Sequence, residues 1–190
     1  MAQIGQDYWV YGELYNEKKG LFYLDIGAHN GVHLSNTYLL EKVYKWDGIC
    51  IEANPKTFTE LEKNRSAKCV QACLHGEEKE CLFEMAGELG RIHDDVNLSS
   101  NRIVLNTRKL EDVLDELNAP NEIDYLSIDI EGSEESVLEH FDFEKYVFSA
   151  ITIERPTKLI RDVLKNNQYV LIKEVPGLDC FYLKTNIVKL

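Results

Sequence analysis

The chain has 190 residues, 44% of them hydrophobic, and its 33 acidic and 21 basic side chains give a formal net charge of −12. This length predicts one core and a single domain over residues 1–190. The negative charge disfavours nucleic-acid binding, no apolar run approaches the roughly 20 residues that span a bilayer, and residues 1–10 lack the basic and apolar stretches of a signal peptide. We therefore expect a cytoplasmic protein that binds neither nucleic acid nor membrane.

Apolar runs of strand length alternate with segments of helical spacing along the chain. The strand-like runs are residues 21–26, 48–52, 68–74, 123–130, 149–154, 169–175 and 179–185. The helical segments are residues 4–19, 35–46, 54–65, 109–117, 133–141 and 157–167. This alternation predicts an α/β fold with parallel strands joined by crossover helices. Because only a short connection with Pro176 and Gly177 joins the last two runs, we expect them to form an antiparallel hairpin at one sheet edge.

Residues 75–106 do not fit the simple alternation. They contain two possible strands, at 80–85 and 102–106, and a polar loop at 86–101 that is rich in Gly, Asp, Asn and Ser. This composition predicts an insertion that serves as a flexible lid or substrate loop, with an ordinary surface excursion as the alternative.

The five cysteines are odd in number, and none stands in a C-x-x-C pair. They lie among apolar neighbours at Cys50, Cys69, Cys73, Cys81 and Cys180. This distribution favours buried free thiols over a disulfide framework or a zinc site.

A glycine turn follows the first strand, in the sequence DIGAHNG of residues 25–31. Gly27 and Gly31 allow the backbone to turn tightly and to approach a ligand. In open parallel sheets, ligands bind beyond the carboxyl ends of the strands, near the point where the strand order reverses. The turn is therefore a candidate ligand site.

Four further positions indicate which ligand the turn binds. Glu52 ends the second strand, where its carboxylate would accept hydrogen bonds from both hydroxyls of a ribose. Ala72 and Cys73 end the third run and are small enough to flank an adenine ring. Such an adenosine belongs either to NAD or to S-adenosylmethionine. Because Asp25 would repel a pyrophosphate but can meet the ammonium group of a methionine moiety, the sequence favours S-adenosylmethionine.

Six sequence blocks that span almost the whole chain carry a family resemblance. They are QIGQD at 3–7, DIGAHNG at 25–31, LSNT at 34–37, GICIEANP at 48–55, IDYLSIDIEGSE at 123–134 and ITIE at 151–154. In this order they resemble the FkbM-type family of S-adenosylmethionine-dependent methyltransferases, especially its short members with an N-terminal S-Q-x-x-Q-D-like element. The resemblance implies a Rossmann-like class I methyltransferase fold, with a seven-stranded, mostly parallel sheet, a C-terminal antiparallel hairpin and helices on both faces. It also implies O-methylation of a hydroxyl on a sugar, glycan or small metabolite.

The matching blocks extend the cofactor site beyond the residues named so far. They add Gln6, Ala28, His29, Asn30, Asn36, Ala53, Asn54 and Asp129. The resemblance implies that Gln6 folds over the cofactor, with capping of the leading helix as the alternative. Two positions depart from the family: His29 stands where Asn is common, and Ala53 interrupts the usual E-P-N-P that begins at the ribose carboxylate.

The fourth long strand supplies the candidate catalytic groups. Asp129 and Glu131 stand two residues apart at its end, so they point to the same face if the strand persists. Closely spaced carboxylates raise one another's pKa, which suits a general base that deprotonates a hydroxyl. We expect Asp129 near the methyl donor and Glu131 toward the acceptor. Glu154, at the end of the fifth strand, and His33, beside the glycine turn, are alternative bases.

Two other roles for these residues stay open. Glu131 could instead cap the helix that begins near Ser133, because acidic groups favour helix N-termini. Asp129, Glu131 and Glu154 could also hold Mg²⁺ and orient a sugar diol, because hard oxygen ligands suit this ion. Whether a metal binds is therefore unknown from the sequence.

The most direct functional interpretation is an S-adenosylmethionine-dependent O-methyltransferase of a small molecule or glycan. The alternative is a non-catalytic interaction or trafficking module that keeps the methyltransferase fold. A nucleic-acid methyltransferase is disfavoured by the net charge and by the lack of an N-P-P-Y-like motif after the fourth strand. The methyl acceptor and the oligomeric state remain open.

Overall fold

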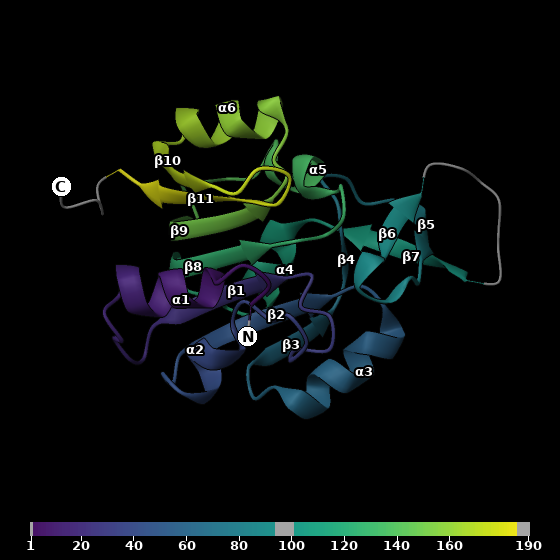
Figure 1. Cartoon of the computed structure of the whole chain (residues 1–190). Helices are drawn as coiled ribbons and strands as arrows, with labels where there is room; N and C mark the ends of the chain where they lie inside the picture. Colours follow the sequence, from purple (N-terminus) through teal and green to yellow (C-terminus); the bar gives the residue numbers. More distant parts are fainter. Residues whose placement is uncertain (1, 94–100, 186–190) are drawn as a thin grey trace.

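The computed structural model describes residues 2–93 and 101–185, which form two sheets with helices (Figure 1). The long sheet has seven strands in the order β10-β11-β9-β8-β1-β2-β3. Its strands are β1 (Phe22–Ile26), β2 (Asp47–Glu52), β3 (Lys68–Gln71), β8 (Glu122–Ile128), β9 (Val147–Glu154), β10 (Tyr169–Glu174) and β11 (Asp179–Lys184). Pairing is parallel from β3 to β9, and β11 is antiparallel to both of its neighbours. The predicted fold and the predicted edge hairpin are confirmed.

Helices cover both faces of the long sheet, as expected. The elements on one face are α1 (Gln6–Tyr8), the π-helical turn η1 (Trp9–Leu14), α2 (Tyr38–Lys42) and α3 (Pro55–Asn64), and those on the other are α4 (Leu110–Glu116), α5 (Glu134–Leu138) and α6 (Lys158–Asn166). The two-residue period of β1 explains this division. Tyr23 packs in the hydrophobic cluster under η1, α2 and α3, whereas Leu24 and Ile26 pack in the cluster under α4, α5 and α6.

Local sequence signals explain where the longest helices begin. Asn54 precedes α3, and its side-chain oxygen accepts a hydrogen bond from the Lys56 N–H at 3.0 Å. Pro55 takes the first helical position, where its missing N–H costs nothing. Thr157 caps α6 in the same way, with its hydroxyl oxygen accepting from the Ile160 N–H.

The sequence predicts one strand over residues 68–74, but the structure has two. β3 ends at Gln71, and the Ala72 N–H donates to the Glu52 carbonyl in the last bond to β2. The chain then leaves the long sheet, and β4 (Cys73–Leu74) pairs with β7 (Arg102–Arg108). Ala72 and Cys73 therefore lie at the junction of the two sheets.

The small sheet has the strand order β4-β7-β5-β6 and stands beside one end of the long sheet (Figure 1). β5 (Glu80–Glu84) and β7 confirm the two strands expected between residues 75 and 106. The expected polar loop at 86–101 is partly regular, with a 3₁₀ turn η2 (Gly87–Leu89) and β6 (Arg91–His93). Residues 94–100 lie outside the described residues, so the expectation of a lid there stays a prediction.

Two smaller points complete the fold. All five cysteines are free thiols, and all but the half-buried Cys69 are buried, in agreement with the expectation. Among the helices of the described ranges, none has both the length and the apolar composition that a membrane span requires.

Candidate active site

The strand order of the long sheet reverses between β1 and β8, and the glycine turn lies at this point. The Asp129 N–H donates to the Ile26 carbonyl at 3.0 Å, so the two strand ends lie directly against each other. Gly27 has a φ of 81°, and a Cβ added there would lie 1.8 Å from the Asp129 carbonyl oxygen. Position 27 therefore requires glycine because of the neighbouring backbone.

For the second glycine of the turn, the structure agrees with the expected tight turn and gives a different reason for the missing side chain. Gly31 has a φ of 77°, but it faces the protein interior. An added Cβ would lie 2.6 Å from Arg65 Cγ and 2.7 Å from Leu61 Cδ1. Gly31 therefore permits close packing of the turn on α3 and its end, and does not permit close approach of a ligand.

Two cavities adjoin the turn. We call the first the narrow cavity; it is enclosed by the ends of β1 and β2, the junction at residues 72–74 and the inner face of the small sheet. Of the predicted cofactor residues it is lined by Gly27, His29, Glu52, Ala53, Ala72, Cys73 and Asp129. Phe83 and Ile92 complete its apolar wall from β5 and β6. Sequence reasoning missed these two, although in β5 the buried Cys81 and Phe83 alternate with half-buried or exposed neighbours.

Glu52 is one of the polar groups of the narrow cavity, and its carboxylate is fixed by the backbone. Its two oxygens accept hydrogen bonds from the His29 N–H at 2.8 Å and the Asn54 N–H at 2.7 Å. Burial raises the pKa of Glu52, and these backbone hydrogen bonds oppose the rise. Each carboxylate oxygen has a second acceptor site, which leaves capacity for the hydroxyls of a ribose.

The second cavity, which we call the open cavity, is polar and lies on the other side of the turn. Of the predicted residues it is lined by Gln6, Asp25, Gly27, Ala28, His29, His33, Asn36, Asp129, Glu131 and Glu154. The two cavities share Gly27, His29 and Asp129. The Gln6 amide donates to Asp179 Oδ2 at 2.8 Å, and its Oε1 accepts from the Ile4 N–H at 3.0 Å just before α1. Its contact with a cofactor stays a prediction.

Asp25 is buried at the wall of the open cavity. Its Oδ2 accepts a hydrogen bond of 2.5 Å from the Thr37 hydroxyl and lies 3.8 Å from Arg65 Nη1. Burial raises the pKa of Asp25, and the charge of Arg65 opposes that rise. On the β8 side of the cavity, the Asn36 amide donates to Ser127 Oγ at 3.0 Å.

Three predicted cofactor residues line neither cavity. Besides Gly31, these are Asn30 and Asn54. Asn30 Oδ1 accepts hydrogen bonds from the backbone N–H groups of Val32 and His33 and so stabilises the turn. The Asn54 side chain accepts a hydrogen bond from the Lys56 N–H and so caps α3. These polar side chains shape the walls of the site, because residues of this type also satisfy the backbone of turns and helix ends.

Asp129 and Glu131 both line the open cavity, but not for the expected reason. β8 ends at Ile128, and the chain turns at Glu131, whose φ is 53°, and at Gly132. The helix-cap role considered for Glu131 stays a prediction. Glu134 accepts the Ile130 and Gly132 N–H groups of this turn at 2.9 and 3.0 Å, and α5 has no side-chain hydrogen bond at its N-cap, Ser133. Glu131 lies 3.3 Å from the Arg155 guanidinium.

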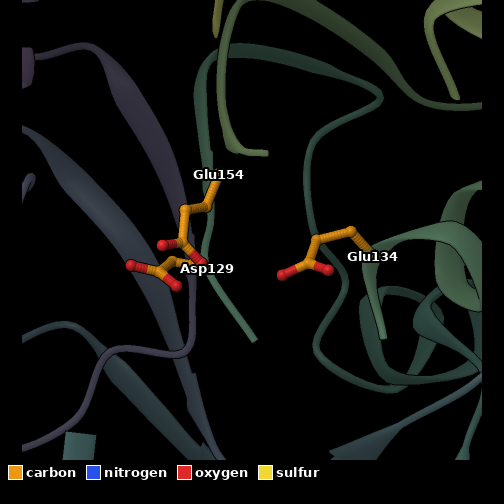
Figure 2. A group of neighbouring side chains, drawn as sticks. All are labelled: Asp129, Glu134 and Glu154. Atoms are coloured by element: carbon orange, nitrogen blue, oxygen red, sulfur yellow. The ribbon is translucent and has the colours of Figure 1, made fainter. Parts of the chain in front are cut away.

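The carboxylates of Asp129, Glu154 and Glu134 converge from three elements (Figure 2). One oxygen from each lies within 4.8 Å of the others. Asp129 is exposed, but the protein around its carboxyl group disfavours the charged form, and repulsion from Glu154 and Glu131 adds to this effect. Together these raise the pKa of Asp129 to about 8. The cluster therefore holds a carboxyl group that titrates near neutral pH.

The expected metal set is not the one that the fold brings together. Glu134 takes the place of Glu131 in the cluster, and its oxygens already accept backbone hydrogen bonds. Arg155 pairs with both Glu154 and Glu131. His33 is exposed at the rim of the open cavity, and its ring centroid lies 6.4 Å from that of His29.

Several solved structures share the fold of this chain. The methyltransferase domain of METTL16 matches with a TM-score of 0.57 at 14% identity, covering 96% of this chain and 67% of the other. The N-terminal domain of human METTL16 in complex with SAH matches with a TM-score of 0.51 at 12% identity, covering 94% and 68%. Methyltransferase FkbM from Methylobacillus flagellatus matches with a TM-score of 0.51 at 15% identity. That match covers 88% of this chain and 44% of the other, so this chain spans less than half of that protein.

These structural matches show the fold, and the family follows from the sequence. Comparison with curated proteins gives no match. The family model described as the methyltransferase FkbM domain matches residues 25–171, which include the glycine turn, Glu52 and the carboxylates at the ends of β8 and β9. The chain therefore belongs to the FkbM methyltransferase family.

Proposed function

We propose that the chain transfers a methyl group from S-adenosylmethionine to a hydroxyl of a sugar, glycan or small metabolite, with a carboxylate as general base. The observation that carries the proposal is the pair of cavities that meet at Gly27, His29 and Asp129. Glu52 lies in one cavity and Asp25 in the other. A ligand with an adenosine at one end and a charged amino acid at the other fits this division.

The narrow cavity supplies the groups that an adenosine requires. Glu52 would accept hydrogen bonds from the ribose hydroxyls, and the apolar walls formed by Ala72, Phe83 and Ile92 suit an adenine. Asp25 and Gln6 would bind the amino-acid end in the open cavity. The SAH complex of human METTL16, which shares the fold, supports this choice of cofactor.

When bound, S-adenosylmethionine supplies an activated methyl group, so the protein mainly supplies alignment, exclusion of water and a base. Asp129 is the best placed base, because it lies where the two cavities meet. Its pKa of about 8 is close to the working pH, which is the condition for efficient general-base catalysis. Asp129 would take the proton of the acceptor hydroxyl, with Glu154 beside it.

We propose that the protein acts in the cytoplasm and that its acceptor is neutral. Glu131 and Glu154 outnumber the single guanidinium of Arg155 in the open cavity, and Asp129 adds a further negative charge once it loses its proton. Together with the net charge of −12, this disfavours phosphate-rich acceptors such as nucleic acid or anionic lipid. Neutral sugars are therefore the first acceptors to test.

A Mg²⁺ ion at the cluster of Asp129, Glu134 and Glu154 would have to compete with Arg155, which pairs with Glu154. The proposed transfer therefore uses no metal. We expect the transfer rate to be the same after dialysis against EDTA and after addition of Mg²⁺. Loss of transfer in EDTA, with recovery in Mg²⁺, would favour the metal-assisted alternative.

The first experiment is calorimetric titration of the purified protein with S-adenosylmethionine, S-adenosylhomocysteine and NAD. We expect binding of the first two and none of NAD. A panel of neutral sugars and their phosphorylated forms, assayed for transfer of a labelled methyl group, then tests the acceptor class. Absence of binding by all three ligands would favour the non-catalytic interaction module.

A further inference from the structure

Arg65 is a buried cation behind the glycine turn, in the position that follows α3. Its guanidinium is completely enclosed by protein. All five of its N–H groups have a hydrogen-bond acceptor: Nε donates to Glu41 Oε2 (2.6 Å), Nη1 to the Gly31 carbonyl (3.1 Å) and Ser35 Oγ (3.3 Å), and Nη2 to Tyr23 OH (2.7 Å) and Thr37 Oγ1 (2.8 Å). One side chain therefore joins β1, the glycine turn, the loop at 35–37 and α2.

The bond between Arg65 and Thr37 fixes the direction of the next hydrogen bond. A threonine hydroxyl has one proton. Because Thr37 Oγ1 accepts from Arg65, that proton is left for Asp25 Oδ2, which lies 2.5 Å away. Arg65 thus orients Thr37, and Thr37 orients the carboxylate of Asp25 at the wall of the open cavity.

Arg65 lies between two carboxylates and pairs more closely with Glu41 than with Asp25. Burial opposes ionisation of Glu41, but hydrogen bonds from Lys42 and Arg65 outweigh it and lower the pKa of Glu41 to about 2. Glu41 is therefore the direct anionic partner of Arg65, at 2.6 Å. Asp25 is 3.8 Å from the guanidinium and receives its short hydrogen bond from a neutral hydroxyl. A ligand ammonium group would thus meet a carboxylate that Thr37 holds in place and that Arg65 approaches less closely than it approaches Glu41.

We propose that Arg65 is the positioning residue for the amino-acid end of the cofactor. It holds Asp25 through Thr37, and it holds the Gly31 carbonyl and Ser35 directly. The proposal rests on the proposed function, because the ligand is taken to be S-adenosylmethionine or its demethylated product. It assigns Arg65 no contact with the ligand.

Two ligands separate positioning from a general loss of structure. S-adenosylhomocysteine has the amino-acid end, whereas adenosine lacks it and fills only the part that we assign to the narrow cavity. Arg65→Lys keeps the charge but loses the planar fork of five donors. We expect this variant to bind S-adenosylhomocysteine about tenfold or more weakly, as lost charge-assisted hydrogen bonds would produce, and adenosine within about twofold of wild type. Thermal unfolding of each sample reports whether the fold is kept.

Thr37→Val provides a second variant that leaves Arg65 in place and removes only the hydroxyl between Arg65 and Asp25. We expect the same selective loss of S-adenosylhomocysteine affinity. Relative to wild type, the double variant should lose less affinity than the product of the two single losses, because both changes interrupt the same chain of hydrogen bonds. Arg161→Lys is the matched control, because Arg161 pairs with Glu174 on α6 and β10, away from both cavities.

The outcomes that overturn the proposal are distinct from failure of the proposed function. Folded Arg65→Lys and Thr37→Val proteins that bind S-adenosylhomocysteine as wild type does would overturn it. Equal losses for adenosine and S-adenosylhomocysteine would also overturn it, because the role would then be structural. Wild-type protein that binds neither ligand would refute the proposed function, and the positioning role with it.

Discussion

The narrow cavity and the open cavity adjoin the same glycine turn but use different physical means to hold polar groups. In the narrow cavity two backbone N–H groups fix Glu52, and most of the remaining wall is apolar. In the open cavity the carboxylates are held by other side chains: Asp25 by Thr37, and Glu154 by Arg155. Backbone N–H donors do not titrate and are not removed when a neighbouring side chain is replaced, whereas side-chain partners can be. Function in the open cavity should therefore be far more sensitive to both.

The largest expected effect lies where the cavities meet. Asp129→Asn removes the proposed base while keeping the shape of the side chain. We expect transfer to fall on the order of 10²- to 10⁴-fold, the usual contribution of general-base catalysis, with little change in S-adenosylhomocysteine affinity. Measurements of kcat and of the S-adenosylhomocysteine binding constant separate the effect on transfer from the effect on binding. Asp142→Asn, at an exposed position away from both cavities, is the matched control. An Asp129→Asn enzyme with wild-type kcat would move the base to Glu131, Glu154 or His33.

The next largest effect tests the backbone-held carboxylate of the narrow cavity. In Glu52→Gln, the amide nitrogen cannot accept a hydrogen bond, so one of the N–H groups of His29 and Asn54 loses its acceptor. We expect adenosine and S-adenosylhomocysteine to bind about tenfold to a hundredfold more weakly, because a buried donor is left unpaired and a ribose contact is lost. This loss is common to both ligands, unlike the loss expected for Arg65→Lys. Glu62→Gln, on the exposed side of α3, should bind both ligands as wild type does.

These two cavities also differ in how far the sequence predicts them. The glycine turn, Glu52 and the end of β8 were predictable because each follows a strand with a clear hydrophobic pattern. Phe83 and Ile92 were not, because they reach the site through a small sheet whose place depends on pairing of β4 with β7. Arg65 reads in the sequence as an ordinary charge at a helix end, and only the packing of α3 against Gly31 reveals its burial.

The carboxylate cluster shows a related limit. Two-residue spacing predicted that Asp129 and Glu131 share a face, but the strand ends before both and the chain turns at Glu131. Glu134 then replaces Glu131 in the cluster with Asp129 and Glu154. A period-two argument fails once the backbone leaves the strand, because it depends on continuous extended geometry.

A change of pH should affect the open cavity selectively, and Glu154→Gln sharpens this difference. Glu154 helps to raise the pKa of Asp129 to about 8, both by charge and by a hydrogen bond between the two carboxyl groups. For wild type we expect kcat/KM to rise with pH as Asp129 loses its proton, with a midpoint near that value. Without the charge of Glu154 the pKa of Asp129 falls, so the rising limb moves to lower pH. The control is Glu139→Gln, at the exposed end of α5, which should leave the pH profile unchanged. An unchanged profile for Glu154→Gln as well would mean that Asp129 is not the group that titrates.

The smallest effect is on stability, and it has the opposite sign to the effect on catalysis. The pKa of Asp129 is about 8 in the folded protein and near its ordinary value of 3.8 in the unfolded chain. Below 3.8 both states keep the proton, and the contribution of Asp129 to stability is fully present. As the pH rises toward 8 the unfolded chain gives up its proton more readily, so that contribution is lost. Asp129→Asn cannot lose a proton, and its thermal midpoint relative to wild type should therefore increase between pH 4 and pH 8 and level off above that. A constant difference over this range would mean that the carboxylate is not strained by its neighbours, and that its suitability as a base must come from the bound ligands.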